Sequence, residues 1–289
     1  MNAKATPPEI KRTNYFWRIA RTLAAVYLGG ILLLILLENW LVYPAPVYPR
    51  GDYGASLGQE EVQFASADGM ELHGWLFEHP SPRGSLLYCH GNGENIAYYP
   101  QRWRDLSQRY RLNVLVFDYR GYGKSNGSPN EAGVLADGDA AQRWLANRVQ
   151  SDPSDVIVMG RSLGGAVAID VATQNGARAL VLESTFTSMP EVAATHYWWA
   201  PVRTVMRNRY SSIDKIAAFK GPTLISHGDA DEVVPYEHGR RLLDVCGGEQ
   251  KRFLTLSGLT HNDPQPPIYY ELLGEFLDEL FETPADAEE

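Results

Sequence analysis

Residues 156–165 read VIVMGRSLGG, and this stretch decides the fold. Four apolar residues in a row, Val156–Met159, indicate a strand that is buried on both faces. The helical sequence AVAIDVATQ follows at once, so the strand turns sharply into a helix. Gly160, Ser162 and Gly164 form the pattern G-x-S-x-G, whose glycines leave space around a serine at a strained tip. The stretch therefore predicts a turn that exposes the Ser162 hydroxyl at a helix N-terminus, where the helix dipole favours developing negative charge.

Short β-rich runs alternate with helical stretches on both sides of this unit. The expected strands are Glu61–Ser66, Glu71–Glu78, Ser85–Cys89, Val114–Asp118, Val156–Met159, Leu180–Glu183, Thr223–Ser226 and Arg252–Leu256. The expected helices are residues 96–109, 133–148, 163–174, 236–246 and 268–281. The first two strands, joined near Asp68 and Gly69, form the pattern of an antiparallel hairpin. Because the later strands are apolar throughout, we expect an α/β fold with a mainly parallel eight-stranded sheet and helices on both faces.

A reactive serine needs a base, and the base needs a carboxylate that orients it. Sites in such sheets lie beyond the carboxyl ends of the strands, which is where Ser162 is expected. His261 follows the last strand and is the base by elimination. The other histidines flank the hairpin, precede the serine, lie within a helix, or fall in or before the turn that holds the acid.

The acid is chosen from three carboxylates. Asp231 and Asp229 both follow the strand Thr223–Ser226, and Glu183 ends the strand before it. We predict Asp231, because an aspartate at the place of Asp229 more often hydrogen-bonds its own turn. Asp229 and Glu183 remain the alternatives.

Catalysis at a serine also requires backbone N–H groups aimed at the developing alkoxide. We expect one donor to be the N–H of Leu163, the residue after the serine. The second is expected in the loop His90-Gly91-Asn92-Gly93, which follows the strand Ser85–Cys89, and Asn92 is its predicted donor. On its own this loop would be an ordinary glycine-rich turn.

An uncharged apolar stretch, TLAAVYLGGILLLILL, occupies residues 22–37. Thr22 to Tyr43 would form a helix of about 33 Å, enough to cross the hydrocarbon core. Lys11, Arg12, Arg18 and Arg21 precede the stretch, so the positive-inside rule predicts a cytoplasmic N-terminus and a catalytic domain outside. A cleaved signal peptide is the alternative, but the stretch is long for one and PAPVYP offers no good cleavage site.

The domain organisation follows from these segments. We expect a basic cytoplasmic N-terminus over residues 1–21, a single-pass transmembrane signal anchor over 22–43, a linker over 44–58, a catalytic domain over 59–283 and a disordered tail over 284–289. A short lid is expected near residues 186–212. It contains the aromatic run Tyr197-Trp198-Trp199 and Met206, which either wall an acyl pocket or form a small cap on the core. Its arginines, Arg203, Arg207 and Arg209, are either solvated or contact anionic headgroups.

Composition excludes several classes of function. Residues 1–43 carry a net charge of +3, which leaves −12 on the rest of the chain. An acidic body without a basic stripe repels phosphate backbones, so no nucleic-acid partner is expected. Cys89 and Cys246 are too few for a disulfide framework or a structural zinc site. The histidine spacing offers no ligand cluster, so no metal or organic cofactor is expected.

Six motifs carry a resemblance to a known family. They are HGNGENI (90–96), FDYRGYGKSNG (117–127), GRSLGG (160–165), ESTFTS (183–188), HGDADEVVP (227–235) and LTHND (259–263). In this order, over about residues 60–282, they resemble the membrane-anchored alpha/beta-hydrolase-domain serine hydrolases, near the bud-emergence-protein and prolyl-oligopeptidase branches. The resemblance implies the alpha/beta-hydrolase fold and a Ser-Asp-His triad, and assigns no catalytic role to the Asp118–Gly127 loop. The chain departs from the family at Thr260, where relatives often have glycine.

The resulting hypothesis is a membrane-anchored serine hydrolase that cleaves carboxylic esters or thioesters of small molecules or lipids through an acyl-enzyme. Relatives described as esterases, lysophospholipases, peptidase-like proteins and depalmitoylases leave the substrate open, and the oligomeric state is also open. A serine peptidase is the second enzyme hypothesis, weakened because no additional domain is present to gate peptides. A catalytically silent membrane scaffold is a third hypothesis, and a missing triad residue would be its signature.

Overall fold

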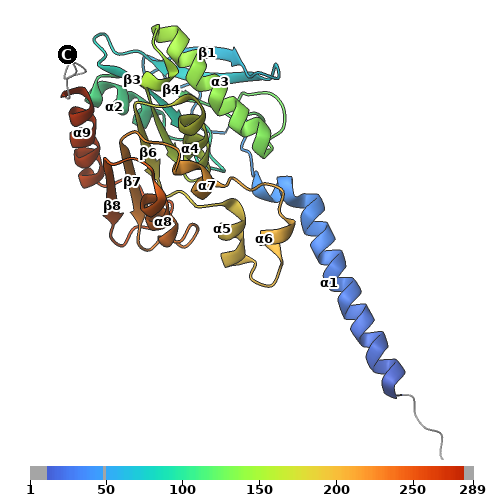
Figure 1. The fold of residues 1–289 in the computed structure, drawn as a ribbon. Helices are drawn as coiled ribbons and strands as arrows, with labels where there is room; N and C mark the ends of the chain where they lie inside the picture. Colours follow the sequence, from blue (N-terminus) through green and yellow to red (C-terminus); the bar gives the residue numbers. More distant parts are fainter. Residues whose placement is uncertain (1–11, 48–49, 283–289) are drawn as a thin grey trace, which may run out of the picture.

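A computed structural model describes residues 12–47 and 50–282 of the chain. Within these residues a long N-terminal helix, α1 (Arg12–Val42), projects from a globular α/β domain (Figure 1). The domain is built on one sheet of eight strands in the order β1-β2-β4-β3-β5-β6-β7-β8. The strands are β1 (Glu60–Ala65), β2 (Glu71–Phe77), β3 (Gly84–Cys89), β4 (Leu112–Phe117), β5 (Val156–Arg161), β6 (Ala179–Glu183), β7 (Thr223–Gly228) and β8 (Lys251–Leu256).

The sheet is parallel except at one edge. β1 pairs with β2, and β2 with β4, in antiparallel register, whereas every pair from β4 to β8 is parallel. The carboxyl ends of β5, β7 and β8 therefore meet at one edge, because parallel strands share their direction. This edge carries the loops that contain Ser162, Asp231 and His261. The predicted strands and the mainly parallel sheet are confirmed.

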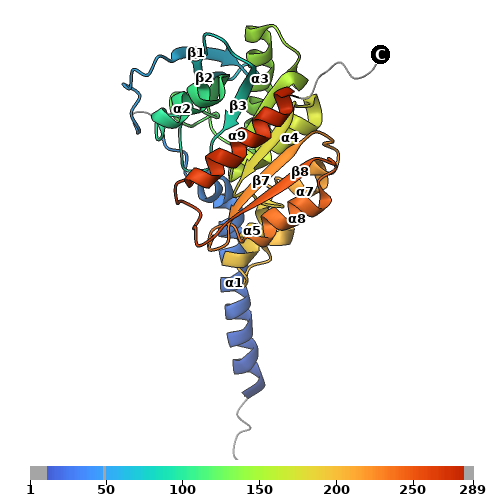
Figure 2. The ribbon, with the colours of Figure 1, turned by 90° about the vertical axis from the view of Figure 1, so that its left-hand side faces the viewer.

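Helices cover both faces of the sheet (Figure 2). One apolar cluster joins the sheet to α2 and α9, and the other joins it to α3, α4 and α8. The bounds of the helices after α1 are α2 (Pro100–Tyr110), α3 (Glu131–Val149), η1 (Pro153–Asp155), α4 (Leu163–Asn175), α5 (Met189–His196), α6 (Val202–Val205), α7 (Ser212–Ile216), α8 (Glu237–Val245) and α9 (Pro267–Glu282). The two-faced arrangement expected from the apolar strands is confirmed.

Two helices begin at places other than those expected. α2 starts at Pro100 rather than at residue 96, because Ile96 is held in the preceding loop: its N–H donates to the Asp118 carboxylate and its carbonyl accepts from the Trp103 indole. Proline at the first helical position suits a helix start, where its missing N–H costs nothing. α1 starts at Arg12, ten residues before the predicted Thr22, so the helix continues through the basic residues Arg18 and Arg21.

The segment predicted as a linker, residues 44–58, contains no helix or strand at its described positions but is docked on the domain. Val47 pairs with Gly123 in an isolated bridge. The Tyr53 hydroxyl donates to the Asp118 carboxylate at 2.8 Å, and the Asn95 amide donates to the carbonyls of Pro46 and Arg50. The segment thus joins α1 to the domain through fixed contacts. The predicted tail over 284–289 and residues 1–11 of the predicted cytoplasmic segment lie outside the described residues.

The turn between β5 and α4 is packed against its neighbours without space for side chains. A Cβ at Gly164 would overlap the carbonyl of Cys89, at the end of β3, and a Cβ at Gly160 would overlap the carbonyl of Gly164. These overlaps involve backbone atoms, which cannot rotate away as a side chain can. The glycines are therefore required for the close approach of the turn to the neighbouring strand.

We predict that Gly164→Ala lowers the free energy of unfolding by about 1–3 kcal/mol, the usual cost of overpacking. Thermal unfolding of the full chain in detergent, followed by calorimetry, measures the change. Gly54→Ala is the matched control, because a Cβ at Gly54 meets only the Asp52 carboxylate at 3.6 Å. Equal melting temperatures for the two variants would contradict the packing described here.

Candidate active site

Ser162 lies between β5 and α4 with φ 52° and ψ −118°, a backbone conformation that L-residues rarely adopt. Three hydrogen bonds hold it there. The Ser162 N–H donates to the Glu183 carbonyl at 2.9 Å, and its carbonyl accepts from the Thr185 hydroxyl at 2.7 Å and from the Gly165 N–H at 3.0 Å. The hydroxyl is thus presented at the carboxyl edge of the sheet, as the sequence pattern predicts.

Ser162, His261 and Asp231 are brought together at this edge. His261 Nε2 lies 3.1 Å from Ser162 Oγ, and His261 Nδ1 lies 2.7 Å from Asp231 Oδ2. The imidazole is buried between the two partners and the carboxylate is fully covered. Both contacts have hydrogen-bonding length, so a proton on the serine can pass to the imidazole while the carboxylate fixes the ring.

The Asp231 carboxylate is held as an anion. Its second oxygen, Oδ1, accepts the N–H groups of Val233 and Val234 at 2.9 and 2.8 Å. Burial opposes its charge, but hydrogen bonds from His227 and His261 outweigh burial and hold the pKa of Asp231 well below its usual value. His227 was not singled out in the sequence, yet its Nε2 lies 3.4 Å from Asp231 Oδ2. The acid is therefore ionised and oriented from both sides.

The two alternative acids lie elsewhere. Asp229 is exposed and accepts the Gly258 N–H at 2.6 Å, so it braces the loop after β8 rather than its own turn. Glu183 is fully buried and directs its carboxylate to Arg102, at 2.6 and 2.7 Å, and to the Tyr88 hydroxyl at 3.1 Å. Neither contacts His261. The geometry thus agrees with the choice of Asp231.

The predicted oxyanion donors come from two loops. Leu163 is the first residue of α4, and the first N–H groups of an α-helix have no partner within the helix. The Asn92 side chain is fixed by the Tyr122 hydroxyl, at 2.7 Å, and by donating to the carbonyl of Val42, at 2.5 Å. Within the described residues no hydrogen bond uses the Asn92 N–H, so both N–H groups are free to donate to a substrate.

Arg161 connects the loops around the serine, a role that the sequence analysis missed. Its guanidinium donates to the carbonyl of His261 at 2.5 Å and pairs with Glu94. Glu94 in turn accepts the N–H of Gly91, next to Asn92, at 3.1 Å. One buried cation thus ties the histidine loop to the predicted donor loop. A long charged side chain in the middle of G-x-S-x-G, at the end of a buried strand, was the available signal.

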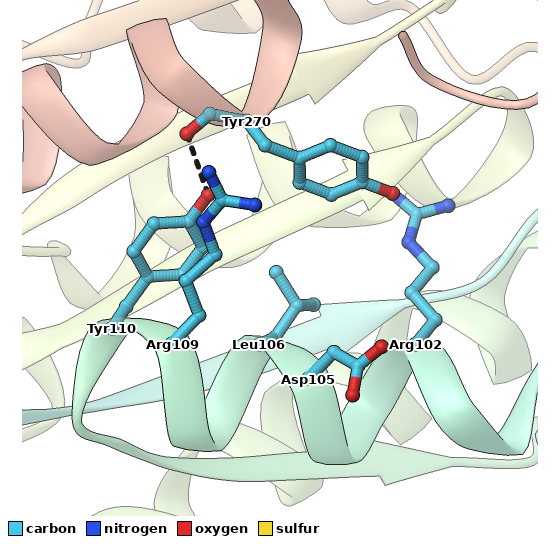
Figure 3. Close-up of a pocket in the computed structure, with 6 residues that line it drawn as sticks. All are labelled: Arg102, Asp105, Leu106, Arg109, Tyr110 and Tyr270. Carbon is cyan, nitrogen blue, oxygen red and sulfur yellow. Dashed lines mark hydrogen bonds between the residues drawn. The ribbon is translucent and has the colours of Figure 1, made fainter. Parts of the chain in front are cut away.

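Two neighbouring cavities lie between α2 and α9 and beside the segment that leads into α9. The first, of about 180 Å³, is lined by Arg102, Leu106 and Tyr270 among others (Figure 3). The second, of about 250 Å³, shares Arg102 and Tyr270 and reaches Arg161 and Asn262, beside the catalytic candidate His261. The second cavity therefore provides space next to the histidine loop on the α2 side of the site.

The lid, residues 186–212, folds into α5, α6 and the start of α7. Its buried residues Ala194, Ala200 and Val202 cluster with Ile31 of α1, and Met206 packs against the same cluster. Tyr197, Trp198 and Trp199 are exposed. Phe186 and Tyr210 of the lid belong to the main core cluster, with Met189 and Val192 packed against it. The lid therefore forms a small cap on the core, one of the two interpretations left open for it, and it also packs against α1.

Residues Tyr15–Val42 form a helix that is long and apolar enough to cross a membrane, judged by length and composition alone. Most of it is exposed, as expected of a segment that does not belong to the core. Among the described residues, no three His, Cys, Asp or Glu side chains are grouped to hold a metal ion.

Comparison with known proteins places this fold and site in context. A model of the alpha/beta hydrolase family matches residues 86–279. The chain is 33% identical to the protein bem46 of Schizosaccharomyces pombe, over 90% of this chain and 93% of the relative. It is 34% identical to alpha/beta hydrolase domain-containing protein 17B of Xenopus laevis, over 70% and 66%. An uncharacterised protein of Mycobacterium tuberculosis is 37% identical over 86% and 88%.

Solved structures share the fold. An esterase of Pyrococcus furiosus, Pf2001, superposes with a TM-score of 0.67 at 19% identity, over 83% of this chain and 99% of the esterase. An esterase of Thermogutta terrifontis gives a TM-score of 0.62 at 21% identity, over 80% and 98%. The family match covers more than half of the chain and includes β3 to β8. The chain belongs to the alpha/beta hydrolase family, in the branch that includes bem46.

Proposed function

We propose that the protein is a membrane-anchored serine hydrolase that cleaves carboxylic esters or thioesters. The observation that carries this proposal is the chain of contacts from Ser162 Oγ to His261 Nε2 and from His261 Nδ1 to Asp231. Membership of a hydrolase family and the esterases among the structural neighbours agree with it. Nothing in this chemistry calls for a cofactor.

The reaction proceeds through an acyl-enzyme. Ser162 Oγ attacks the substrate carbonyl carbon while His261 Nε2 takes the hydroxyl proton. The carbonyl oxygen becomes an oxyanion and accepts the N–H groups of Leu163 and Asn92. Collapse breaks the bond to the leaving oxygen or sulfur, which takes the proton from His261. Water then repeats the sequence on the acyl-serine and releases the acid, and Asp231 stabilises the imidazolium in both halves.

The anchor is the helix Tyr15–Val42. Its length and apolar composition suit a bilayer, and the basic residues at its start, Arg18 and Arg21 among those described, favour a cytoplasmic N-terminus. The hydrolase domain would then face the opposite side. A lipid-like or other acyl ester is the proposed substrate, because an anchored domain stays within reach of such molecules.

A fluorophosphonate probe is expected to label the full chain at Ser162 and to lose all labelling in Ser162→Ala. The serine is activated only where a histidine lies within hydrogen-bonding distance, as His261 does. Ser257→Ala is the matched control, since Ser257 is exposed and should leave labelling unchanged. Intact-mass spectrometry reads the result, and labelling that persists in Ser162→Ala would refute the nucleophile.

Substitution of the three carboxylates distinguishes the acid. Asp231→Asn should lower kcat for an activated ester by about 10³-fold or more, because the imidazole loses its orienting anion. Asp229→Asn and Glu183→Gln should lower kcat less, because neither carboxylate contacts His261. Melting temperatures of all three variants control for misfolding. If Glu183→Gln gives the largest kcat loss at an unchanged melting temperature, the acid is assigned wrongly.

Esters of graded acyl length test the substrate class. We expect kcat/KM to rise about tenfold or more from acetyl to hexanoyl p-nitrophenyl esters, since each buried methylene contributes about 0.8 kcal/mol. The matching anilides should react far more slowly, because an amine is a poorer leaving group. A flat or falling series would remove the preference for acyl chains, and efficient anilide cleavage would favour a peptidase.

A further inference from the structure

The lid and α1 form one structural unit. Ala194, Ala200 and Val202 of the lid bury an apolar surface against Ile31, with Leu34 and Ile35 beside them. Figure 1 shows α5 and α6 next to the part of α1 nearer the domain, and Figure 2 also shows α5 there. Any position that α1 takes in a membrane therefore also positions the lid.

A carboxylate reinforces this contact. Glu38, which interrupts the apolar pattern of α1, is only 5% exposed. It accepts the backbone N–H groups of Arg207 and Asn208 at 2.8 and 2.7 Å, as well as the Asn208 amide at 2.8 Å. The Arg207 guanidinium pairs with it at 3.2 Å. The lid, rather than water, therefore satisfies the acid of the apolar helix.

The contacts extend far along α1. At the domain end, the hydroxyl of Tyr43, the residue after α1, donates to Asn208 at 2.7 Å. At the other end, the Tyr27 hydroxyl donates to the carbonyl of Trp199 at 3.1 Å. The two tyrosines are sixteen positions apart, which is about 24 Å along a helix. The aromatic run of the lid consequently lies at the level of Tyr27.

The far end of the lid has the side chains of a membrane interface. In the lid tip, residues 197–206, Trp198 is 83% exposed, and Tyr197 and Trp199 are also exposed. Its one charged side chain, Arg203, pairs with Glu191 at 2.7 Å. Tryptophan and tyrosine concentrate at the boundary between headgroups and acyl chains, where their rings are buried and their polar atoms remain hydrated.

We propose that the lid tip is a membrane-inserted surface, which lies in the phospholipid leaflet beside α1. The inference rests on the proposed anchoring of α1 and goes beyond it, because an anchor alone leaves the domain free to stand away from the bilayer. The occupant is lipid, since the exposed aromatic rings continue the bare apolar surface of α1, whose Leu23, Val26 and Leu28 are exposed. The hydrolase domain is thereby held against the leaflet at a fixed depth.

The lid also touches the site. His196, at the end of α5, has its Nε2 3.0 Å from the carbonyl of Val233. Val233 donates its own N–H to the Asp231 carboxylate. His196, the residue before the lid tip, is thus two contacts away from the proposed catalytic acid. An acyl substrate that leaves the bilayer beside the lid would arrive near the site.

Dye labelling of the full chain in phosphatidylcholine nanodiscs tests the proposal. An environment-sensitive maleimide dye is attached in three variants: Trp198→Cys in the lid tip, Leu23→Cys in α1, and Asn147→Cys near the end of α3. Cys89 and Cys246 are buried and should not react. We expect blue-shifted emission and quenching by lipids with a spin label near the headgroup at position 198, and neither effect at position 147. Position 23 reports whether α1 is embedded.

Each pattern of quenching has a distinct meaning. Quenching at 23 and 198 supports the inserted lid, and quenching at 198 alone refutes the anchor and with it the proposal that the tip lies beside an embedded α1. Quenching at 23 with position 198 behaving like 147 overturns the inserted lid and leaves the anchor standing. Blue-shifted emission at 198 without quenching by lipid means that protein, such as a second copy of the chain, covers the tip, which also overturns the proposal. Quenching at neither position overturns both.

Activity provides an independent measurement. Trp198→Ser should lower kcat/KM about tenfold for a long-chain ester presented in vesicles, because one large apolar contact with the leaflet is lost. The same variant should cleave a water-soluble acetyl ester at the rate of the parent chain. Ile268→Ser is the matched control, since Ile268 is an exposed apolar side chain on α9. Equal losses on both substrates in Trp198→Ser would contradict the proposal.

Discussion

The backbone of Ser162 is held at φ 52° by contacts from several elements at the carboxyl edge of the sheet. A residue with a side chain pays for such a conformation with strain of order 1–3 kcal/mol, which persists only when the surroundings over-determine it. Here the Glu183 carbonyl and the Thr185 hydroxyl fix both sides of the serine peptide unit. Glycines at 160 and 164 let the turn approach Cys89 without a gap. The chemistry therefore depends on β3, β5 and β6 being in register, since their ends supply these contacts.

Two carboxylates near this edge illustrate how surroundings decide the role of an acid. Asp231 and Glu183 both belong to loops or strand ends beside the serine, and both are buried. The Asp231 carboxylate accepts two backbone N–H groups and lies within hydrogen-bonding distance of a histidine, so its charge is available to orient an imidazole. The Glu183 carboxylate forms a salt bridge with Arg102. A buried carboxylate that is already paired in this way contributes to packing and to local charge balance. The two carboxylates are alike in burial, and their different hydrogen-bonding partners give them different roles.

The sequence predicts most of the sheet because its signals are local. Apolar runs identify β3 to β7, a hairpin pattern identifies β1 and β2, and the order serine, acid, histidine follows from loops that each succeed a strand. Ser162, Asp231 and His261 are found together for that reason. The link made by Arg161 is not visible in the same way, because it joins residues a hundred positions apart. His227 and Asp231 are only four positions apart, but their contact depends on the geometry of the turn between them and not on a sequence pattern. The sequence does not predict that the lid docks on α1, for a related reason. A run such as Tyr197-Trp198-Trp199 indicates an apolar contact but does not identify its partner. The depth, sidedness and substrate of the proposed enzyme remain predictions.

Tyr43 has a consequence for the order in which the protein is assembled. Its ring is part of the main core cluster. Its hydroxyl contacts Asn208 and Tyr210, which lie more than 160 positions later in the sequence and are therefore synthesised later. The apolar helix leaves the ribosome first, yet the core that receives its last turn closes only after synthesis has passed residue 210. Loop closure over such a separation is entropically costly and slow relative to local folding. With the helix as the proposed membrane anchor, insertion would precede domain folding, and a nascent domain that misfolds would do so while already tethered to the membrane.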